Sequence, residues 1–238
     1  MSSSVAAGEI ARFDAMASRW WDPSGPMRPL HRMNPARIGW VLAQAERYLG
    51  ATAGLKTLDV GCGAGIAAEA LARAGLDVLG IDAAPDVIAA GAAHAGGQGL
   101  PLTYRVAAAE DLRDEPARFR LITALEVIEH VADPGPFLAT LAHLAAPGAL
   151  LVLSTLDRSP ASFLAAKVAA EYVLRWLPVG THDWRRFLRP AELAAALRQS
   201  GWRPVASAGM VPAQGGGWRI TARPGVNYLM AAIRPEGG

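Results

Sequence analysis

The chain has 238 residues, 52% of them hydrophobic, and a formal net charge of +2. This length favours one folded domain with an ample core, and no run reaches the ~18 apolar residues that a membrane span needs. The start of the chain lacks a basic segment followed by an apolar block, so no secretory signal is expected. The single cysteine excludes an internal disulfide and suits a reducing compartment.

The first 50 residues are expected to form a helical cap. Residues 8–21 read as a helix and residues 23–29 as a loop. Asn34 and Pro35 then look like the N-cap and first-turn proline of a second helix, which extends to about Tyr48.

Strands and helices alternate from residue 56 onward. Strands are expected at residues 56–61, 77–82, 102–107, 120–125, 149–156, 203–208 and 228–233, and helices at residues 65–74, 85–94, 136–144 and 189–200. Such alternation is typical of a doubly wound α/β fold with a mostly parallel sheet, here of seven strands.

A glycine-rich loop follows the first of these strands. Asp59 lies near the end of the strand, and the loop has the pattern G-x-G-x-G at Gly61, Gly63 and Gly65. Ile66 stands where the dinucleotide fingerprint needs its third glycine, and no lysine follows to complete a phosphate loop. The pattern resembles the S-adenosylmethionine loop of the class I methyltransferases.

A second acidic residue supports a nucleotide-like ligand. Asp82 ends the second predicted strand, about twenty residues after the loop, where a carboxylate accepts the hydroxyl groups of a ribose. The glycine loop and Asp82 together predict a cofactor site.

Three side chains that could bind a metal ion or transfer a proton follow the fourth predicted strand. Glu126, Glu129 and His130 are spaced so that one helical turn would place them on one face. Two carboxylates and an imidazole suit magnesium or zinc, which could bind and acidify a phenolic oxygen. Alternatively His130 has a structural role at a helix start, or it is the general base.

Motifs along nearly the whole chain resemble the ubiquinone biosynthesis O-methyltransferases. They are residues 18–22, 29–37, 59–65, 126–131, 154–156, 180–183 and 226–228. The resemblance implies a sheet that ends in an antiparallel hairpin, and S-adenosylmethionine as the cofactor. It implies that the cofactor contacts Arg37, Gly61, Asp82 and Leu125, and that Glu126, Glu129 and His130 form a metal site. The family often has Met at position 125 and Asn at position 157, where this chain has Leu125 and Asp157.

An apolar insertion at residues 159–177, within a lid at 159–185, follows the fifth strand. Its polar residues after position 161 are Ser162, Lys167, Glu171 and Arg175. A polar face so narrow indicates a helix that packs deeply or enters a membrane interface. At the interface such a helix would give the enzyme access to a polyprenyl substrate in the bilayer. His182 and Asp183 could line the acceptor site.

The combined expectation is one methyltransferase domain, residues 1–238, that methylates polyprenyl catechol and demethylubiquinol intermediates. It would be cytoplasmic and peripherally associated with the inner membrane, and other enzymes of ubiquinone biosynthesis are candidate partners. No basic stripe or RNA-binding module is evident, which argues against nucleic acid. Two alternatives stay open: a soluble small-molecule O- or N-methyltransferase with another acceptor, and a non-catalytic protein that binds S-adenosylmethionine.

Overall fold

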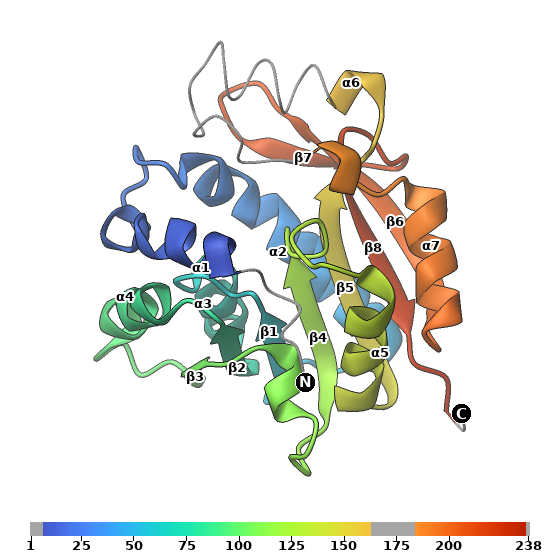
Figure 1. Ribbon diagram of the computed structural model, residues 1–238, viewed down its shortest axis with the longest axis horizontal. Coiled ribbons are helices and arrows are strands. Elements are labelled where there is room, and N and C mark those ends of the chain that lie inside the picture. The colour runs from blue at the N-terminus through green and yellow to red at the C-terminus, as the bar shows by residue number, and fades with distance from the viewer. Residues whose placement is uncertain (1–6, 163–183, 237–238) are drawn as a thin grey trace.

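The computed structural model describes residues 7–162 and 184–236, which contain one sheet of eight strands (Figure 1). The spatial order is β3-β2-β1-β4-β5-β8-β6-β7. The strands are β1 Lys56–Val60, β2 Asp77–Asp82, β3 Leu102–Val106, β4 Phe119–Leu125, β5 Ala145–Leu156, β6 Arg203–Pro212, β7 Trp218–Thr221 and β8 Asn227–Ile233.

Strands β1 to β5 run parallel, whereas β8 is antiparallel to both β5 and β6, and β7 is antiparallel to β6. The predicted mostly parallel α/β fold is therefore confirmed, but the predicted count of seven strands is wrong. The strand that the sequence did not reveal is β7, which has four residues and lies at the edge of the sheet. Its four residues alternate between apolar and polar, but so short a run gives only a weak strand signal.

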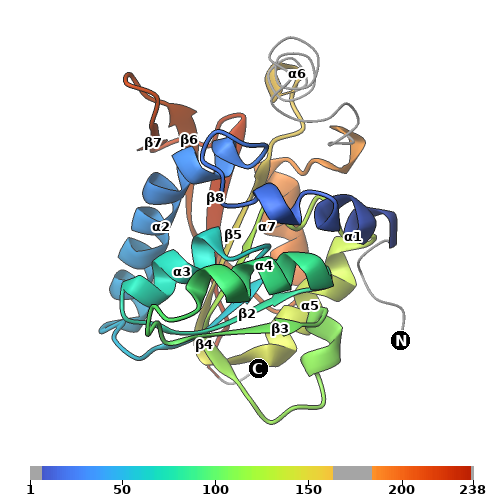
Figure 2. The same ribbon diagram turned by 90° about the vertical axis from the view of Figure 1, so that its left-hand side faces the viewer.

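Helices cover both faces of the sheet (Figure 2). The helices are α1 Ala7–Asp14, α2 Arg28–Leu49, α3 Ile66–Arg73, α4 Pro85–Ala95, α5 Pro134–Leu144, α6 Pro160–Ser162 and α7 Pro190–Gln199, with short 3₁₀ turns at Ala17–Arg19, Ala109–Leu112 and Trp184–Arg186. Helices α2 and α3 pack on one face, and α5 and α7 pack on the other.

The central strands are apolar on both faces because both faces are covered. In β5, Leu150 and Val152 belong to the core under α2 and α3, whereas Leu151 and Leu153 belong to the core under α5 and α7. This division follows from the two-residue period of a strand, and it explains why β5 reads as an uninterrupted hydrophobic run.

The start of α2 differs from the expectation. The helix begins at Arg28, with Pro29 in its first turn, so Pro35 lies inside the helix and Asn34 is not an N-cap. Two proline signals compete here, and only the earlier one marks the start. The amide of Asn34 instead donates from Nδ2 to the carbonyl oxygen of Ile66 at 2.8 Å, which joins α2 to the start of α3.

The first predicted helix is also shorter than expected, because α1 ends at Asp14 and a separate 3₁₀ turn spans Ala17–Arg19. Most of the predicted lid, with His182 and Asp183, lies outside the described residues. In the part of the chain that is described, no helix is long and apolar enough to cross a membrane.

Candidate cofactor and active site

The predicted site residues gather at the carboxyl ends of the parallel strands. The chain builds β1, β2 and β3 outward in one direction and then crosses back to place β4 on the other side of β1. Ligands of doubly wound sheets bind outside the strand ends at such a reversal. The glycine loop after β1, Asp82 at the end of β2 and Glu126 after β4 all lie at this edge.

The glycine loop needs glycine for two physical reasons. Gly61, Gly63 and Gly65 have φ angles of 64°, 55° and 91°, which L side chains rarely adopt. A Cβ atom added at these positions would also collide with a neighbouring side chain: Val127 at Gly61, Trp20 at Gly63 and Tyr104 at Gly65. Helix α3 starts directly after the loop.

Asp82 is held against the loop by backbone amides. Its Oδ2 accepts a hydrogen bond from the amide of Gly63 at 3.0 Å, and its Oδ1 accepts one from the amide of Ala84 at 2.9 Å. Burial raises the pKa of this carboxyl group, and the two amides oppose that shift. Each carboxylate oxygen has a second lone pair with which it can accept a ligand hydroxyl.

Arg37 and Asp59 form an oppositely charged, buried pair of groups near the loop. Arg37 is 3% exposed and donates from Nη2 to Oδ1 of Asn34 at 3.1 Å. Asp59 is 2% exposed and accepts from Oγ1 of Thr123 at 2.6 Å. Burial lowers the pKa of Arg37 and raises that of Asp59 to about 6, and the attraction between them opposes both shifts.

Each of these two side chains has one buried polar atom that makes no hydrogen bond within the described residues. Within the described residues, Nε of Arg37 and Oδ2 of Asp59 are buried without a hydrogen-bond partner. Native proteins rarely leave buried polar atoms unpaired, because each costs about 1–3 kcal/mol. The two atoms therefore favour a polar ligand at this position. A helix that began at Asn34 and Pro35 would place Arg37 in its first turn, and this expectation is wrong. Arg37 lies well inside α2, because the helix starts at Arg28.

The segment after β4 is a turn, and the predicted helical turn is wrong. Leu125 ends β4, and Glu126 is the one non-glycine residue of the described chain with a positive φ, 60°. A left-handed conformation costs a residue of this type on the order of 1–3 kcal/mol. Such strain is frequent at functional sites, and here it places the Glu126 side chain at the strand ends.

Glu126 and Glu129 are held by side chains of β5 and β8. Oγ of Ser154 donates to Oε1 of Glu126 at 2.7 Å, and Nδ2 of Asn227 approaches the same oxygen at 3.5 Å. Oγ1 of Thr155 donates to Oε2 of Glu129, which is 3% exposed, at 2.8 Å. Burial raises the pKa of Glu129, and so does the negative charge of Glu126.

Sequence reasoning assigned no role to Ser154, Thr155 or Asn227. Their signal was present, since hydroxyl residues at the end of an otherwise apolar, buried strand require polar partners. Only the antiparallel pairing of β5 with β8 reveals that Asn227 lies opposite Leu156 and near Glu126.

The predicted metal ligands are not assembled as a cluster. In residues 7–162 and 184–236, no three His, Cys, Asp or Glu side chains come close enough to hold a metal ion. His130 packs its ring edge-on against Phe13, with centroids 5.8 Å apart, while the two carboxylates contact β5 and β8. The donor chemistry nevertheless suits a hard cation, because Oε1 of Glu129 and Oδ1 of Asn227 are buried without a partner among those residues.

A glycine loop and an acidic residue at adjacent strand ends of this sheet indicate a nucleotide-type cofactor site, and the family match shows that the chain is a class I S-adenosylmethionine-dependent methyltransferase. The profile of the methyltransferase domain family matches residues 31–207. Ubiquinone biosynthesis O-methyltransferases of Cereibacter sphaeroides strain ATCC 17025 and of Azorhizobium caulinodans are each 44% identical to the chain. The first match covers 99% of this chain and 99% of the relative. The second covers 96% of this chain and 94% of the relative.

The chain belongs to the ubiquinone biosynthesis O-methyltransferase family and is an S-adenosylmethionine-dependent O-methyltransferase. The resemblance found in the sequence is thus confirmed.

Solved structures agree on the fold. Magnesium protoporphyrin IX methyltransferase from Synechocystis PCC 6803, crystallised with bound S-adenosylmethionine, is 17% identical and superposes with a TM-score of 0.64 over 98% of this chain and all of the other. An S-adenosylmethionine-dependent methyltransferase of Thermotoga maritima, described as a possible histamine N-methyltransferase, is 14% identical. It superposes with a TM-score of 0.64 over 95% of this chain and 98% of the other.

Proposed function

We propose that residues 1–238 form one methyltransferase domain that transfers the methyl group of S-adenosylmethionine to a phenolic oxygen of polyprenyl catechol and demethylubiquinol intermediates. The observation that carries this proposal is the position of Glu126 and Glu129. Glu129 is buried and Glu126 half-buried, and both follow the end of β4, next to the strand whose end carries the glycine loop. The names of the full-length relatives support the choice of acceptor.

The chain's main task is to position the reactants, because the sulfonium cofactor itself carries the reactive methyl group. The phenolic oxygen forms a bond to the methyl carbon, the carbon–sulfur bond breaks, and S-adenosylhomocysteine leaves. Arg37, Asp59, the three loop glycines, Asp82 and Leu125 would hold the cofactor. In the absence of a bound cation, His130 would take up the phenolic proton as the general base, since an imidazole has its pKa near neutrality.

We further propose that Glu126, Glu129 and His130 hold a divalent cation, magnesium or zinc, when the acceptor is bound. Such a cation would lower the pKa of the phenol and orient its oxygen. The raised pKa of Glu129 and its unpartnered Oε1 among the described residues support this assignment, because a cation would relieve the repulsion between the buried Glu129 and the half-buried Glu126.

Methyl transfer to short-chain catechol and demethylquinol analogues tests the acceptor and the cation together. We expect turnover of both analogues, loss of turnover after dialysis against a chelator, and recovery with magnesium or zinc. Transfer to simple amines or to non-catecholic phenols at equal rates would contradict the proposed acceptor. Full activity in chelator would contradict the cation and leave His130 as the base.

We also propose that the insertion at residues 159–177 binds the membrane surface peripherally. Arg185, Arg186 and Arg189 follow the insertion and are exposed. Each basic residue near an anionic surface contributes about 1 kcal/mol, and burial of Phe163, Trp176 and Leu177 would add an apolar contribution.

Replacing Phe163, Trp176 and Leu177 together by Ser should release the protein from anionic vesicles and leave turnover of a soluble catechol unchanged. Raised salt should weaken binding of the unchanged protein, because exposed charges are screened. Val106→Ser is the control, since Val106 is a large exposed apolar residue elsewhere. Equal co-sedimentation of the triple variant and the unchanged protein would mean that the insertion is only a buried lid.

A further inference from the structure

A segment near the N-terminus crosses over the cofactor loop and is anchored at both ends of α4. We call residues 10–22 the strap. Oδ1 of Asp14 accepts hydrogen bonds from the amides of Asp86 at 3.0 Å and Val87 at 3.3 Å, in the first turn of α4. The N-cap of α4 is Ala84, which has no side-chain acceptor of its own, so the strap supplies the cap.

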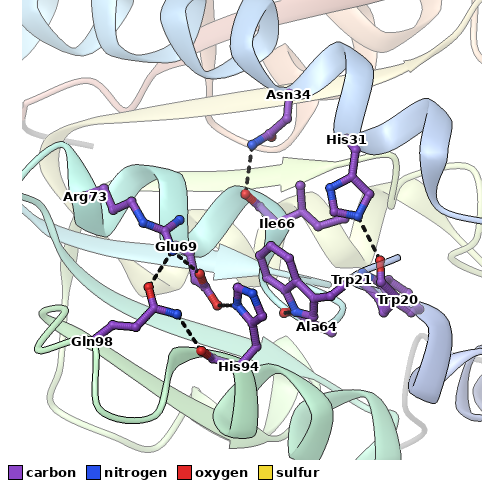
Figure 3. Close-up of polar contacts among 10 residues, drawn as sticks. All are labelled: Trp20, Trp21, His31, Asn34, Ala64, Ile66, Glu69, Arg73, His94 and Gln98. Atoms are coloured by element: carbon purple, nitrogen blue, oxygen red, sulfur yellow. Dashed lines mark hydrogen bonds and ion pairs between the residues drawn. The ribbon is translucent and has the colours of Figure 1, made fainter. Parts of the chain in front are cut away.

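The other anchor is an aromatic stack at the opposite end of α4. The indole of Trp21 lies parallel to the imidazole of His94, with centroids 3.5 Å apart and an angle of 6° between the planes (Figure 3). The indole Nε1 also donates to the carbonyl oxygen of Ala64, inside the glycine loop, at 3.0 Å. Trp21 therefore connects the strap, α4 and the loop.

The imidazole of His94 is held in its stacking orientation by a contact with α3. Its Nδ1 lies 2.7 Å from Oε1 of Glu69 on α3, a side chain with no exposed surface. Arg73 pairs with the other oxygen of Glu69 at 2.6 Å and donates to Gln98, whose Nε2 in turn donates to the carbonyl oxygen of His94 (Figure 3). A ring fixed by a buried carboxylate is a rigid platform for the indole.

The result of this anchoring is the position of Trp20. Trp20 is 5% exposed, and its indole occupies the space next to Gly63 that any side chain at that position would need. Its carbonyl oxygen accepts a hydrogen bond from Nε2 of His31 on α2 at 2.9 Å, so α2 also holds the strap (Figure 3).

We propose that Trp21 and His94 are positioning residues that hold the strap closed over the glycine loop and thereby set the rate at which cofactor and product leave. This rests on binding of the cofactor at the loop. A molecule at Gly63 meets Trp20, so it leaves only when the strap lifts. Lifting breaks the stack between Trp21 and His94, and the strength of the stack therefore controls the opening.

The test measures release of radiolabelled S-adenosylmethionine from the full-length protein after a chase with unlabelled S-adenosylhomocysteine. His94→Gln keeps a hydrogen-bond donor for Glu69 but removes the ring, and we expect about two- to tenfold faster release. His94→Phe keeps a ring beneath Trp21 and should stay closer to the original rate. His143→Gln is the matched control, since His143 occupies the last turn of α5, away from the strap.

Two further measurements separate positioning from general damage. The single-turnover rate of methyl transfer, with cofactor bound beforehand, should be unchanged in His94→Gln, because the strap acts on exchange. Trp21→Phe weakens the stack from the other side and should also accelerate release. Trp21→Phe also removes the hydrogen bond to Ala64. The double variant, Trp21→Phe with His94→Gln, should therefore accelerate release by less than the product of the two single effects, because both changes weaken the same stack.

Release at the original rate in both single variants would overturn the strap proposal, and so would acceleration by the full product of the two single effects in the double variant. Failure of the unchanged protein to retain S-adenosylmethionine would instead contradict the cofactor site itself. No acceptor is present during the chase, so an error in the proposed acceptor cannot affect the result.

Discussion

Replacing Gly63 by Val should reduce the affinity for S-adenosylmethionine by at least two orders of magnitude. Gly63 has a φ of 55°, a conformation that strains a β-branched residue by on the order of 1–3 kcal/mol. The new side chain would also collide with the indole of Trp20 and disturb the amide that donates to Asp82. Strain, collision and loss of the contact with Asp82 all act on the same loop. Isothermal titration calorimetry with S-adenosylmethionine measures the loss.

Gly54→Val is the matched control for this prediction. Gly54 has a φ of 69°, so the backbone strain is similar, but no atom lies within 4 Å of the position that its Cβ would take. The control variant should lose stability by a comparable amount and keep its affinity for the cofactor. If Gly63→Val bound S-adenosylmethionine as Gly54→Val does, the loop would not be the cofactor site.

Replacing Glu129 by Gln should slow methyl transfer by about 10²- to 10⁴-fold, the range expected for a group that assists proton transfer or orients the acceptor. Glu126→Ala should also slow the reaction. The affinity for S-adenosylmethionine should stay nearly unchanged in both variants, because the carboxylates face the acceptor in our proposal. Single-turnover rates and calorimetric titrations give the two quantities.

A stability measurement distinguishes this role from a structural one. Glu129 is buried, has an unpartnered Oε1 among the described residues, and is repelled by Glu126. Removing its charge should leave the unfolding temperature unchanged or raise it, as is common when a strained functional group is neutralised. Glu115→Gln, at a partly exposed pair with Arg105, should change neither rate nor affinity. Normal turnover by Glu129→Gln would remove Glu129 from the active site.

The sequence alone determined the order of the elements, apart from β7, and the location of the glycine loop. The β1–loop–α3 unit was predicted to within a residue or two, because an apolar strand, alternating glycines and an alanine-rich helix are all local signals. Asp82 was found for the same reason, as a carboxylate that ends a short buried strand. The resemblance to the family also depended on short motifs whose residues are contiguous in the chain.

Only the tertiary structure decided which distant residues meet. Ser154, Thr155 and Asn227 support the two carboxylates because β5 lies between β4 and β8, and that neighbourhood depends on sheet order. The strap contacts with α4 and the glycine loop join residues separated by 43 to 73 positions, and no local pattern encodes them. The turn at Glu126 was missed because a helical spacing of side chains does not report the backbone conformation, which the packing around the strand end imposes. Local signals fix strands, helices and loops, whereas the burial of both sheet faces fixes which of them become neighbours.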